Sequence, residues 1–232
     1  MKLAIMQPYL FPYLGYWQMM SAVDRFVVYD DVNYIKGGWI NRNYILSNGA
    51  PHLFTLSLDR ASPFRKINEI EIKPGPENRN KVVSFIRNAY MKAPYFKAVF
   101  PLIEDIFGQK ENNLALFLFN HFRKVCDYIG IETELLLSSD IEKDNSLHAQ
   151  DKVIEINKRL NAAQYINAIG GQELYSRDDF AANGLRLSFI RMKPETYPQF
   201  KNEFVPNLSI IDVMMFNSPE NIRRLLSSYE LV

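Results

Sequence analysis

Apolar and polar residues at the start of the chain follow a pattern that predicts a strand, a loop, a helix and a second strand. The apolar run at 3–6 is expected to form a short buried strand, and residues 25–30 (RFVVYD) a second one. Pro8 and Pro12 favour a rigid extended loop between them, because proline fixes its own backbone angle and disfavours helix in the residue before it. A short helix is expected at 15–22. A helical crossover of this kind predicts two parallel strands.

The periodicity changes further along the chain. Alternating apolar residues around an Asn-Gly pair predict a β-hairpin between Asn43 and Leu58. From 77 to 130 the spacing becomes helical, which predicts a helical insertion. Strands are further expected at 67–72, 133–139, 163–168 and 185–192, a helix at 147–160, and terminal helices from Ser209 onward. The expected architecture is one α/β domain over 1–232, with a mainly parallel Rossmann-like sheet, the hairpin and the insertion.

Composition narrows the classes of function. The 27 Lys and Arg nearly balance the 26 Asp and Glu, which argues against a protein that coats DNA through its phosphates. No stretch approaches the roughly 18 apolar residues of a membrane helix, and the apolar run at the N-terminus is too short for a signal peptide. We therefore expect a cytoplasmic protein without membrane insertion. Cys126 is the single cysteine, so neither an intrachain disulfide nor a cysteine-based zinc site is expected.

The first candidate site follows the first strand. Ligands of parallel α/β sheets bind at the carboxyl ends of the strands, where Gln7 and Tyr9 are expected. The helix that follows would offer free N–H groups to an anion, and Gly15 would allow close approach to the backbone. Tyr16 completes this group of candidate binding residues. The alternative is an aromatic plug over the edge of the sheet.

The second candidate site follows the second strand. Asp30 and Asp31 can hold a cation, orient a ribose or accept a proton, although adjacent side chains on a strand face opposite ways. Lys36 and Arg42 can bind phosphate, Arg42 as a planar fork. The alternative is ordinary turn chemistry, since loops are rich in Asp, Asn and Gly. The candidate binding residues in this stretch are Trp39, Asn41 and Asn43.

At the end of the expected strand at 163–168 and just after it, Asn167 and the pair Gly170 and Gly171 would lie at the same edge of the sheet. They could contact a ligand or form only a turn. The three histidines are not paired in any metal-binding spacing, so no metal site is expected. His148 is the one histidine placed where a general base is useful. Nucleophile-elbow, Walker and dinucleotide-binding motifs are missing from the sequence, and no cofactor can be named from it.

The runs MQPYLFPYLGYW (6–17), DRFVVYDDVNY (24–34) and WINRN (39–43) closely resemble the WbqC-like family. The resemblance continues through YMKAPYF (90–96), 165–175, 197–200 and LSIIDVMM (208–215), and so spans nearly the whole chain. It adds Tyr175, Gln199, Ser209 and Asp212 to the positions that match the family pattern. Of these, Tyr175 and Gln199 are expected to bind substrate.

The resemblance implies a bacterial protein of surface-polysaccharide, O-antigen-type biosynthesis that transfers an acyl or aminoacyl group to a nucleotide-linked amino sugar. Such a reaction needs a base and a group that stabilises the oxyanion. Asp30 or Asp31 is expected as the base, with Lys36 and Arg42 stabilising negative charge. The first alternative is a module that only binds a nucleotide-linked sugar.

A weaker similarity connects residues 12–16 with the HxGH signature of nucleotidylyltransferases. Tyr13 and Tyr16 stand where that signature has histidines, and tyrosine cannot carry positive charge. Nucleotidyl transfer, which needs positive charge near the phosphorus, is therefore the least favoured alternative.

Overall fold

The structure is a computed structural model, and it describes residues 1–201 and 203–232. Its central element is a six-stranded sheet in the order β10-β9-β8-β1-β2-β7. The strands are β1 (Lys2–Met6), β2 (Arg25–Val28), β7 (Glu134–Leu137), β8 (Gln164–Ala168), β9 (Arg186–Met192) and β10 (Tyr229–Leu231). All neighbours pair in parallel except β10, which runs antiparallel to β9. The fold class predicted from the sequence is confirmed.

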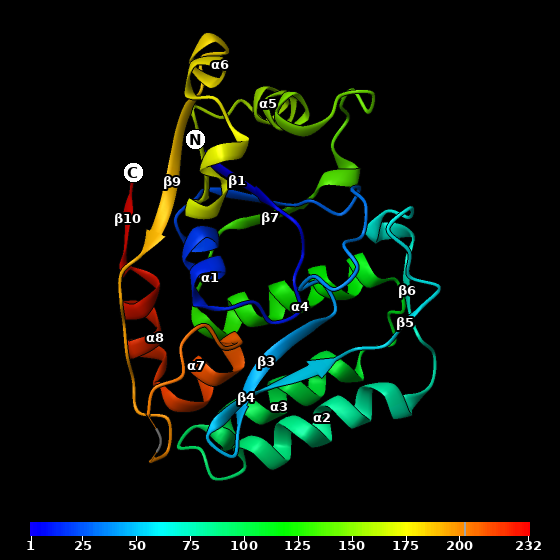
Figure 1. Cartoon of the computed structure of the whole chain (residues 1–232), viewed down its shortest axis with the longest axis vertical. Helices are drawn as coiled ribbons and strands as arrows, with labels where there is room; N and C mark the ends of the chain where they lie inside the picture. Colours follow the sequence, from blue (N-terminus) through cyan, green and yellow to red (C-terminus); the bar gives the residue numbers. More distant parts are fainter. Residues whose placement is uncertain (202) are drawn as a thin grey trace.

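Helices cover both faces of this sheet (Figure 1). Ala4 and Phe26 point into one apolar core with α1 (Leu14–Ser21), whereas Leu3, Ile5 and Val27 point into the core under α5 (Ala149–Arg159) and α6 (Arg177–Ala182). β1 and β2 are apolar over most of their length because both of their faces are buried. β1 connects through α1 to β2 on one side, and β8 connects through α6 to β9 on the other. This switch in direction between β1 and β8 is the place where open α/β sheets bind ligands.

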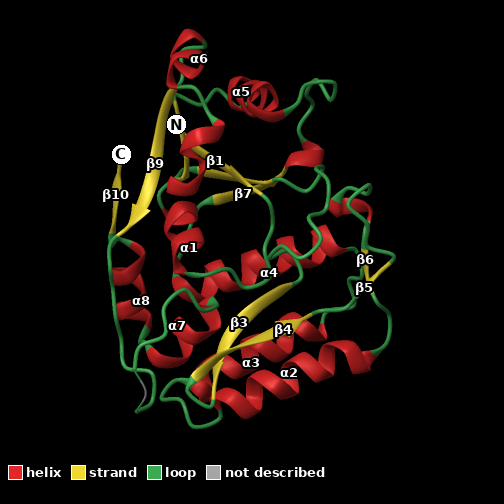
Figure 2. Ribbon diagram, viewed as in Figure 1, coloured by secondary structure: helices red, strands yellow, loops and turns green. Residues whose placement is uncertain are grey.

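A second layer packs below the sheet in Figure 1 and consists of three helices and a hairpin that stands apart from the sheet (Figure 2). The elements are α2 (Pro76–Tyr90), α3 (Phe96–Gly108), α4 (Leu114–Ile129), β3 (Arg42–Ser47) and β4 (Ala50–Thr55). Asn113 caps α4 by accepting the Leu116 N–H at 3.2 Å, and Gly130 ends it with a φ of 78°. The hairpin turns through Asn48 and Gly49, whose φ angles of 52° and 78° suit the primed turn that the Asn-Gly pair predicts.

The prediction for residues 67–72 needs correction, and so does the one for the C-terminal residues. The strand expected at 67–72 is mostly a 3-10 turn, η1 (Ile67–Glu69), and only β6 (Glu71–Ile72) pairs, with β5 (Leu58–Asp59). The reason is local: the Glu69 side chain accepts the backbone N–H of Lys66 at 2.9 Å, which closes the turn.

The terminal helices α7 (Ile210–Phe216) and α8 (Pro219–Leu226) are present, but the last residues form β10, which covers the edge of β9. Two more 3-10 segments, η2 (Ser138–Asp140) and η3 (Ile169–Leu174), follow β7 and β8 at the carboxyl edge of the sheet. None of the helices in the described residues combines the length and apolarity that a membrane crossing requires.

Candidate functional site

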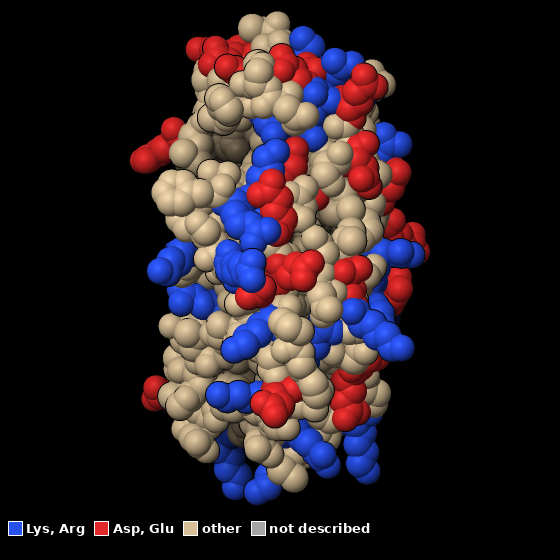
Figure 3. Space-filling model, turned by 90° about the vertical axis from the view of Figure 1, so that its right-hand side faces the viewer, with Lys and Arg blue, Asp and Glu red and all other residues tan. Residues whose placement is uncertain are grey.

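The carboxyl edge of the sheet gathers segments that are far apart in the sequence. Gln7 follows β1, Asp30 and Asp31 follow β2, η2 follows β7, and η3 follows β8. Because the four strands are parallel, these segments share one edge, as the sequence predicts. Figure 3 shows a hollow in the upper part of one face, at about the height that α5 has in Figure 1.

Asp31 lies at the centre of a buried group of charges. Its Oδ2 atom is 3.0 Å from Nζ of Lys143 and 3.3 Å from Nζ of Lys152. The three side chains are 6%, 2% and 9% exposed, respectively. Lys143 comes from the loop after η2, and Lys152 from the first turn of α5. We call these three residues and the adjacent Ser138 the Asp31 cluster.

The Asp31 cluster holds more positive than negative charge. Two ammonium groups and one carboxylate leave a net charge of about +1 in a part of the protein that water hardly reaches, where unpaired charge is costly. Burial alone would raise the pKa of Asp31, but its hydrogen bonding and the charges of Lys143 and Lys152 lower that pKa below the ordinary value. Asp31 therefore remains a carboxylate and is a weak base.

Two polar atoms in the Asp31 cluster lack partners. The Ser138 hydroxyl lies close enough to Asp31 to help lower its pKa. Nevertheless, neither that hydroxyl nor Oδ1 of Asp31 makes a hydrogen bond of acceptable geometry to any described residue. These two atoms lie at the carboxyl edge of the sheet, where ligands of parallel α/β sheets bind, and a hydroxyl that is not held in good geometry can turn toward a polar ligand.

The two lysines differ in how fully their donors are used. Lys143 donates to Asp31, to the Ser138 carbonyl and to the Ile141 carbonyl, the last at 3.2 Å, which occupies all three ammonium hydrogens. Lys152 donates to Asp31 and otherwise lies 5.7 Å from the centre of the Tyr29 ring. Lys152 therefore keeps donor capacity for a ligand, whereas Lys143 does not.

Asp30 has partners different from those of Asp31 and joins two loops to the end of β2. Its Oδ1 accepts the Ser139 N–H at 2.9 Å, and its Oδ2 accepts the Asn68 side chain at 3.3 Å. With 1% of its surface exposed, Asp30 connects β2 to η2 and η1. The two adjacent carboxylates, which follow the end of β2, therefore bond to different groups: Asp30 to loop amides and Asp31 to two lysines.

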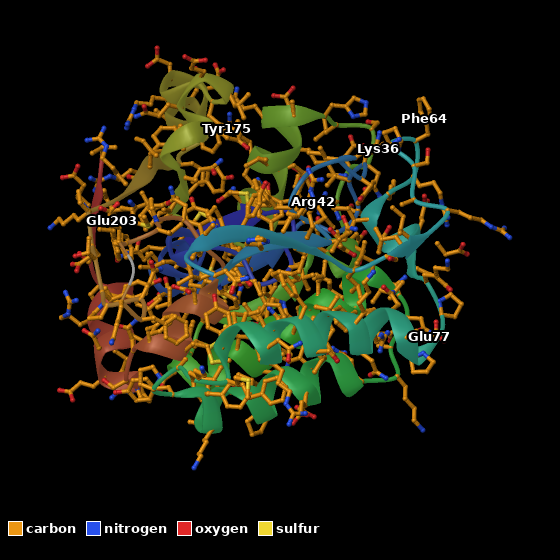
Figure 4. All side chains as sticks on the ribbon, turned by 60° about the horizontal axis from the view of Figure 1, so that its bottom comes forward. Lys36, Arg42, Phe64, Glu77, Tyr175 and Glu203 are labelled. Carbon is orange, nitrogen blue, oxygen red and sulfur yellow. The ribbon has the colours of Figure 1, made fainter. Side chains whose placement is uncertain are left out.

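The loop after β2 closes on itself through Arg42. Nε of Arg42 donates to the Gly38 carbonyl at 3.0 Å, and Nη2 donates to the Gly37 carbonyl. Within 1–201 and 203–232, no carboxylate forms an ion pair with Arg42. Lys36 is exposed and lies toward the periphery, farther out than Arg42 (Figure 4). Among the described residues, the ion pairs of Asp31 are made by Lys143 and Lys152 and not by these two cations, and Arg42 shapes its own loop.

Asn41 and Asn43 use their side-chain amides within the protein. Asn41 accepts the Tyr34 hydroxyl and donates to the Leu56 carbonyl, both at 2.8 Å. Asn43 donates to the carbonyls of Leu10 and Phe11 at 3.0 and 2.7 Å. The latter bonds hold the proline loop in the shape in which Phe11 has a φ of 45°. Both asparagines position the loops that carry other candidate residues.

An open pocket of about 340 Å³ lies between the proline loop and the hairpin. Tyr13 and Trp39 are 37% and 42% exposed there. Burial raises the pKa of Tyr13, and burial together with the nearby Tyr13 raises that of Tyr9, so both phenols stay neutral hydrogen-bond donors. Flat apolar rings beside a few polar groups suit a small organic ligand. We call it the aromatic pocket; its lining residues are Tyr9, Tyr13, Trp39, Asn43 and Asn207.

Gly15 and Tyr16 support the aromatic pocket from behind. A Cβ atom at Gly15 would lie 2.6 Å from Cε2 of Tyr13, so glycine makes room for that ring. Tyr16 is 3% exposed, donates to the Gln7 carbonyl at 2.8 Å and stacks on Phe122. Tyr16 therefore belongs to the core, while Gln7 is half-buried at the end of β1.

In the segment after β8, some residues bond within the protein and others are accessible to a ligand. Asn167 donates to the Tyr165 hydroxyl at 3.1 Å and accepts the Ala168 N–H at 2.7 Å. A Cβ atom at Gly171 would lie 3.2 Å from the Asn167 amide, whereas one at Gly170 would meet no atom within 4 Å. Tyr175 is half-buried against Tyr165, and Figure 4 shows it well away from Lys36. Gly170 is thus exposed, with open space beside its Cα atom, and a ligand can approach the backbone there.

Gln199 is part of a second buried polar group, centred on Asp212. Gln199 donates to Oδ2 of Asp212 at 2.6 Å, Tyr197 donates to the same atom at 2.9 Å, and Tyr90 donates to Oδ1 at 2.7 Å. Burial raises the pKa of Asp212, against the effect of these donors. This Asp212 network, consisting of the four residues, fixes the segment that leads to Asn207 of the aromatic pocket.

Sequence reasoning missed Lys143, Lys152 and Ser138. A signal for Lys152 was present, because it falls beside Val153 and Ile156 on the apolar side of α5, where a solvated lysine is unexpected. Nothing in the sequence near Lys143 marks it. His148 is exposed and its ring makes no capping hydrogen bond to α5. Within the described part of the chain, no three His, Cys, Asp or Glu side chains gather in a metal-binding arrangement.

Comparisons with known proteins identify relatives by sequence. The model of the WbqC-like protein family matches residues 7–224. An uncharacterized protein of Mycobacterium tuberculosis (strain ATCC 25618 / H37Rv), Rv1507c, is 26% identical over 219 residues, which cover 93% of each chain. No solved structure matches the chain.

Proposed function

We propose that this chain, which belongs to the WbqC-like protein family, binds a nucleotide-linked amino sugar used in bacterial surface-polysaccharide biosynthesis. The observation that supports this most strongly is the Asp31 cluster, in which two buried lysines share one carboxylate at the carboxyl edge of a parallel sheet. The surplus positive charge suits the diphosphate of such a ligand.

Lys152 is the proposed contact to phosphate, because its ammonium group is not saturated by protein acceptors. The Ser138 hydroxyl, which lies beside Asp31 and helps lower its pKa, can rotate to donate to a further phosphate oxygen. Oδ1 of Asp31 repels phosphate and suits a ligand hydroxyl instead. Together these groups would bind a phosphate next to a ribose or sugar hydroxyl.

The aromatic pocket is the proposed place for the sugar ring. Tyr9, Tyr13 and Trp39 offer apolar ring surface, against which the C–H groups of a sugar can be buried. The phenol groups of Tyr9 and Tyr13 can bond to its hydroxyl or amide groups. Gln7 and Pro8 lead from the end of β1 toward this pocket, which would allow one ligand to extend along them.

Titration calorimetry with UDP-linked and dTDP-linked amino sugars tests this proposal. Lys152→Met removes the charge and keeps the apolar stem, while Lys143 still neutralises Asp31. We expect affinity to fall about tenfold to a hundredfold, the range for a charge-assisted hydrogen bond. The matched control is Lys158→Met on the exposed end of α5, which should leave affinity unchanged. Equal affinities of the two variants, or no binding by the wild type, would contradict the proposal.

A second candidate is acyl or aminoacyl transfer to the amine of the bound sugar. In this step the amine nitrogen attacks the carbonyl carbon, a C–N bond forms, the donor's leaving group departs and the amine loses a proton to a base. The unsaturated Lys152 favours this candidate because it can stabilise the oxyanion. Asp31, with its lowered pKa, is a poor base, so the base proposed from the sequence loses support. Mass spectrometry of the sugar after incubation with acyl donors would distinguish transfer from binding alone.

Nucleotidyl transfer has less support than either. Tyr16 stands at one histidine position of the HxGH signature, yet its hydroxyl is buried and bonded to the Gln7 carbonyl. The hydroxyl is therefore used inside the protein and is not placed to contact a phosphate.

A further inference from the structure

A protruding tip on the side of the molecule carries exposed apolar and cationic residues together. It consists of residues 33–37 and 60–66, and we call it the Phe64 tip. Phe64 is 92% exposed and Ile35 is 51% exposed. Figure 4 shows Phe64 and Lys36 at the same outer corner of the molecule. A single exposed apolar side chain needs no explanation, but two of them beside cations on one protruding tip form a small patch that suits an interaction surface.

The Phe64 tip is held in place by backbone bonds. The Tyr34 N–H donates to the Arg65 carbonyl at 2.9 Å, and Asn33 and Lys66 form an antiparallel bridge. The Arg65 N–H donates to the Ser62 carbonyl at 3.1 Å, which closes the turn that presents Phe64. Phe64 is therefore displayed on a braced turn, and the order of that turn does not depend on burying the ring.

Charge on the Phe64 tip has one sign. Its two segments contain Lys36, Arg60, Arg65 and Lys66 and no Asp or Glu. The closest acidic residues along the chain are Asp59, which lies 3.9 Å from Arg60, Asp31, which is buried with Lys143 and Lys152, and Glu69, whose side chain accepts the Lys66 backbone N–H. Figure 3, which shows this side of the molecule, has several blue Lys and Arg side chains beside protruding uncharged ones, and red Asp and Glu side chains lie next to them.

We propose that the Phe64 tip inserts into the headgroup region of an anionic lipid bilayer. Apolar side chains flanked by cations are the arrangement with which proteins bind reversibly to such surfaces. A convex tip formed by two short segments is too small for a stable protein interface of roughly 800 Å² per partner. A fluid bilayer needs no complementary shape and accepts a protruding ring. The charge of the tip selects anionic lipids.

Co-sedimentation with vesicles of phosphatidylcholine, with and without phosphatidylglycerol, tests this proposal. We expect the wild type to bind only the anionic vesicles, and less as salt is raised. Phe64→Ser should weaken binding about tenfold, and Lys36→Gln about fivefold for the one cation removed. Met91→Ser is the matched control, since Met91 is 57% exposed on another part of the surface and should not matter. Thermal melts of all variants confirm that they are folded.

Three outcomes would overturn the proposal. The first is no binding to anionic vesicles at low salt. The second is binding that Phe64→Ser and Met91→Ser weaken equally, which would remove the special role of the tip. The third is a dimer of the wild type in sedimentation velocity that Phe64→Ser dissociates, which would assign the tip to a second copy of the chain. The test does not involve nucleotide sugars, so its failure leaves the proposed binding function standing.

Discussion

Two buried aspartates in this protein have different partners, and their pKa values are shifted in opposite directions. Asp212 is surrounded by uncharged donors from Tyr90, Tyr197 and Gln199 that bond to both of its oxygens, and its pKa is raised. Asp31 is paired with two ammonium groups, its pKa is lowered, and its Oδ1 lacks a partner among the described residues. The first arrangement is complete within the protein. The arrangement around Asp31 has charge and hydrogen-bonding capacity that the protein does not use. This difference distinguishes a candidate binding site from a network that only stabilises the fold.

The strongest test of this comparison is Asp31→Asn. It leaves Lys143 and Lys152 buried without a carboxylate, so we expect the free energy of unfolding to fall by about 3–5 kcal/mol in urea denaturation. Adding Lys152→Met to Asp31→Asn should restore part of the loss, because one of the two unpaired charges is removed. A single variant as stable as the wild type would contradict the ion pairing.

Asp212→Asn should have a smaller effect. One side-chain oxygen still accepts a hydrogen bond, but the new amide hydrogens face donors, so we expect a loss of about 2 kcal/mol. The exposed Asp127→Asn is the control and should change stability by less than about 0.5 kcal/mol. Ligand binding should persist in Asp212→Asn if the network is structural. Loss of binding in a variant that remains folded would instead place Asp212 in the site.

The substitution Trp39→Ala tests whether the aromatic pocket contacts the sugar. Because the ring is proposed to contact the sugar and not the phosphates, affinity for a nucleotide-linked sugar should fall about tenfold, or about 1.4 kcal/mol, while affinity for UDP stays the same. Leu53→Ala on β4, at a site 41% exposed, is the control. An equal loss for both ligands would mean that Trp39 does not distinguish the sugar from the nucleotide.

The pH dependence of stability should differ in sign between the two aspartates. Asp31 has a folded pKa below the ordinary 3.8, so its stabilising contribution is complete above that pH and is lost as pH falls through the lowered value. Asp212 has a folded pKa above 3.8, so stability falls as pH rises from there to the raised value. Urea titrations at several acidic pH values should show that Asp31→Asn flattens the acid loss and Asp212→Asn removes the opposite slope. If stability depended on pH in the same way in both variants, the opposite pKa shifts of Asp31 and Asp212 would be contradicted.

Much of the fold could be predicted because the decisive information is local. The apolar runs at 3–6 and 25–30 and the Asn48-Gly49 turn form the expected strands and hairpin. The prediction of a strand over 67–72 was wrong because a turn closed by the Glu69 side chain forms there instead of strand pairing. β10 was missed because its pairing with β9 depends on which edge of the sheet is free, and no short-range pattern encodes that.

The candidate site was harder to predict, since it depends on contacts over long sequence separations. Asp31 meets Lys152 from 121 positions away. Polar residues that looked suited to a ligand, such as Asn41, Asn43 and Gln199, bond instead to other parts of the chain. Residue type alone cannot tell a satisfied amide from a free one. The edge of the sheet was predictable, and the groups left unsatisfied there were not.

The central claim is that Lys152 binds the phosphates of a nucleotide-linked sugar. A thermodynamic cycle in titration calorimetry tests it most directly, comparing UDP with uridine on the wild type and on Lys152→Met. On the wild type the diphosphate should strengthen binding about a hundredfold, and on Lys152→Met that gain should shrink at least about tenfold, equivalent to roughly 1.4 kcal/mol of coupling. The same gain on both proteins would contradict the account.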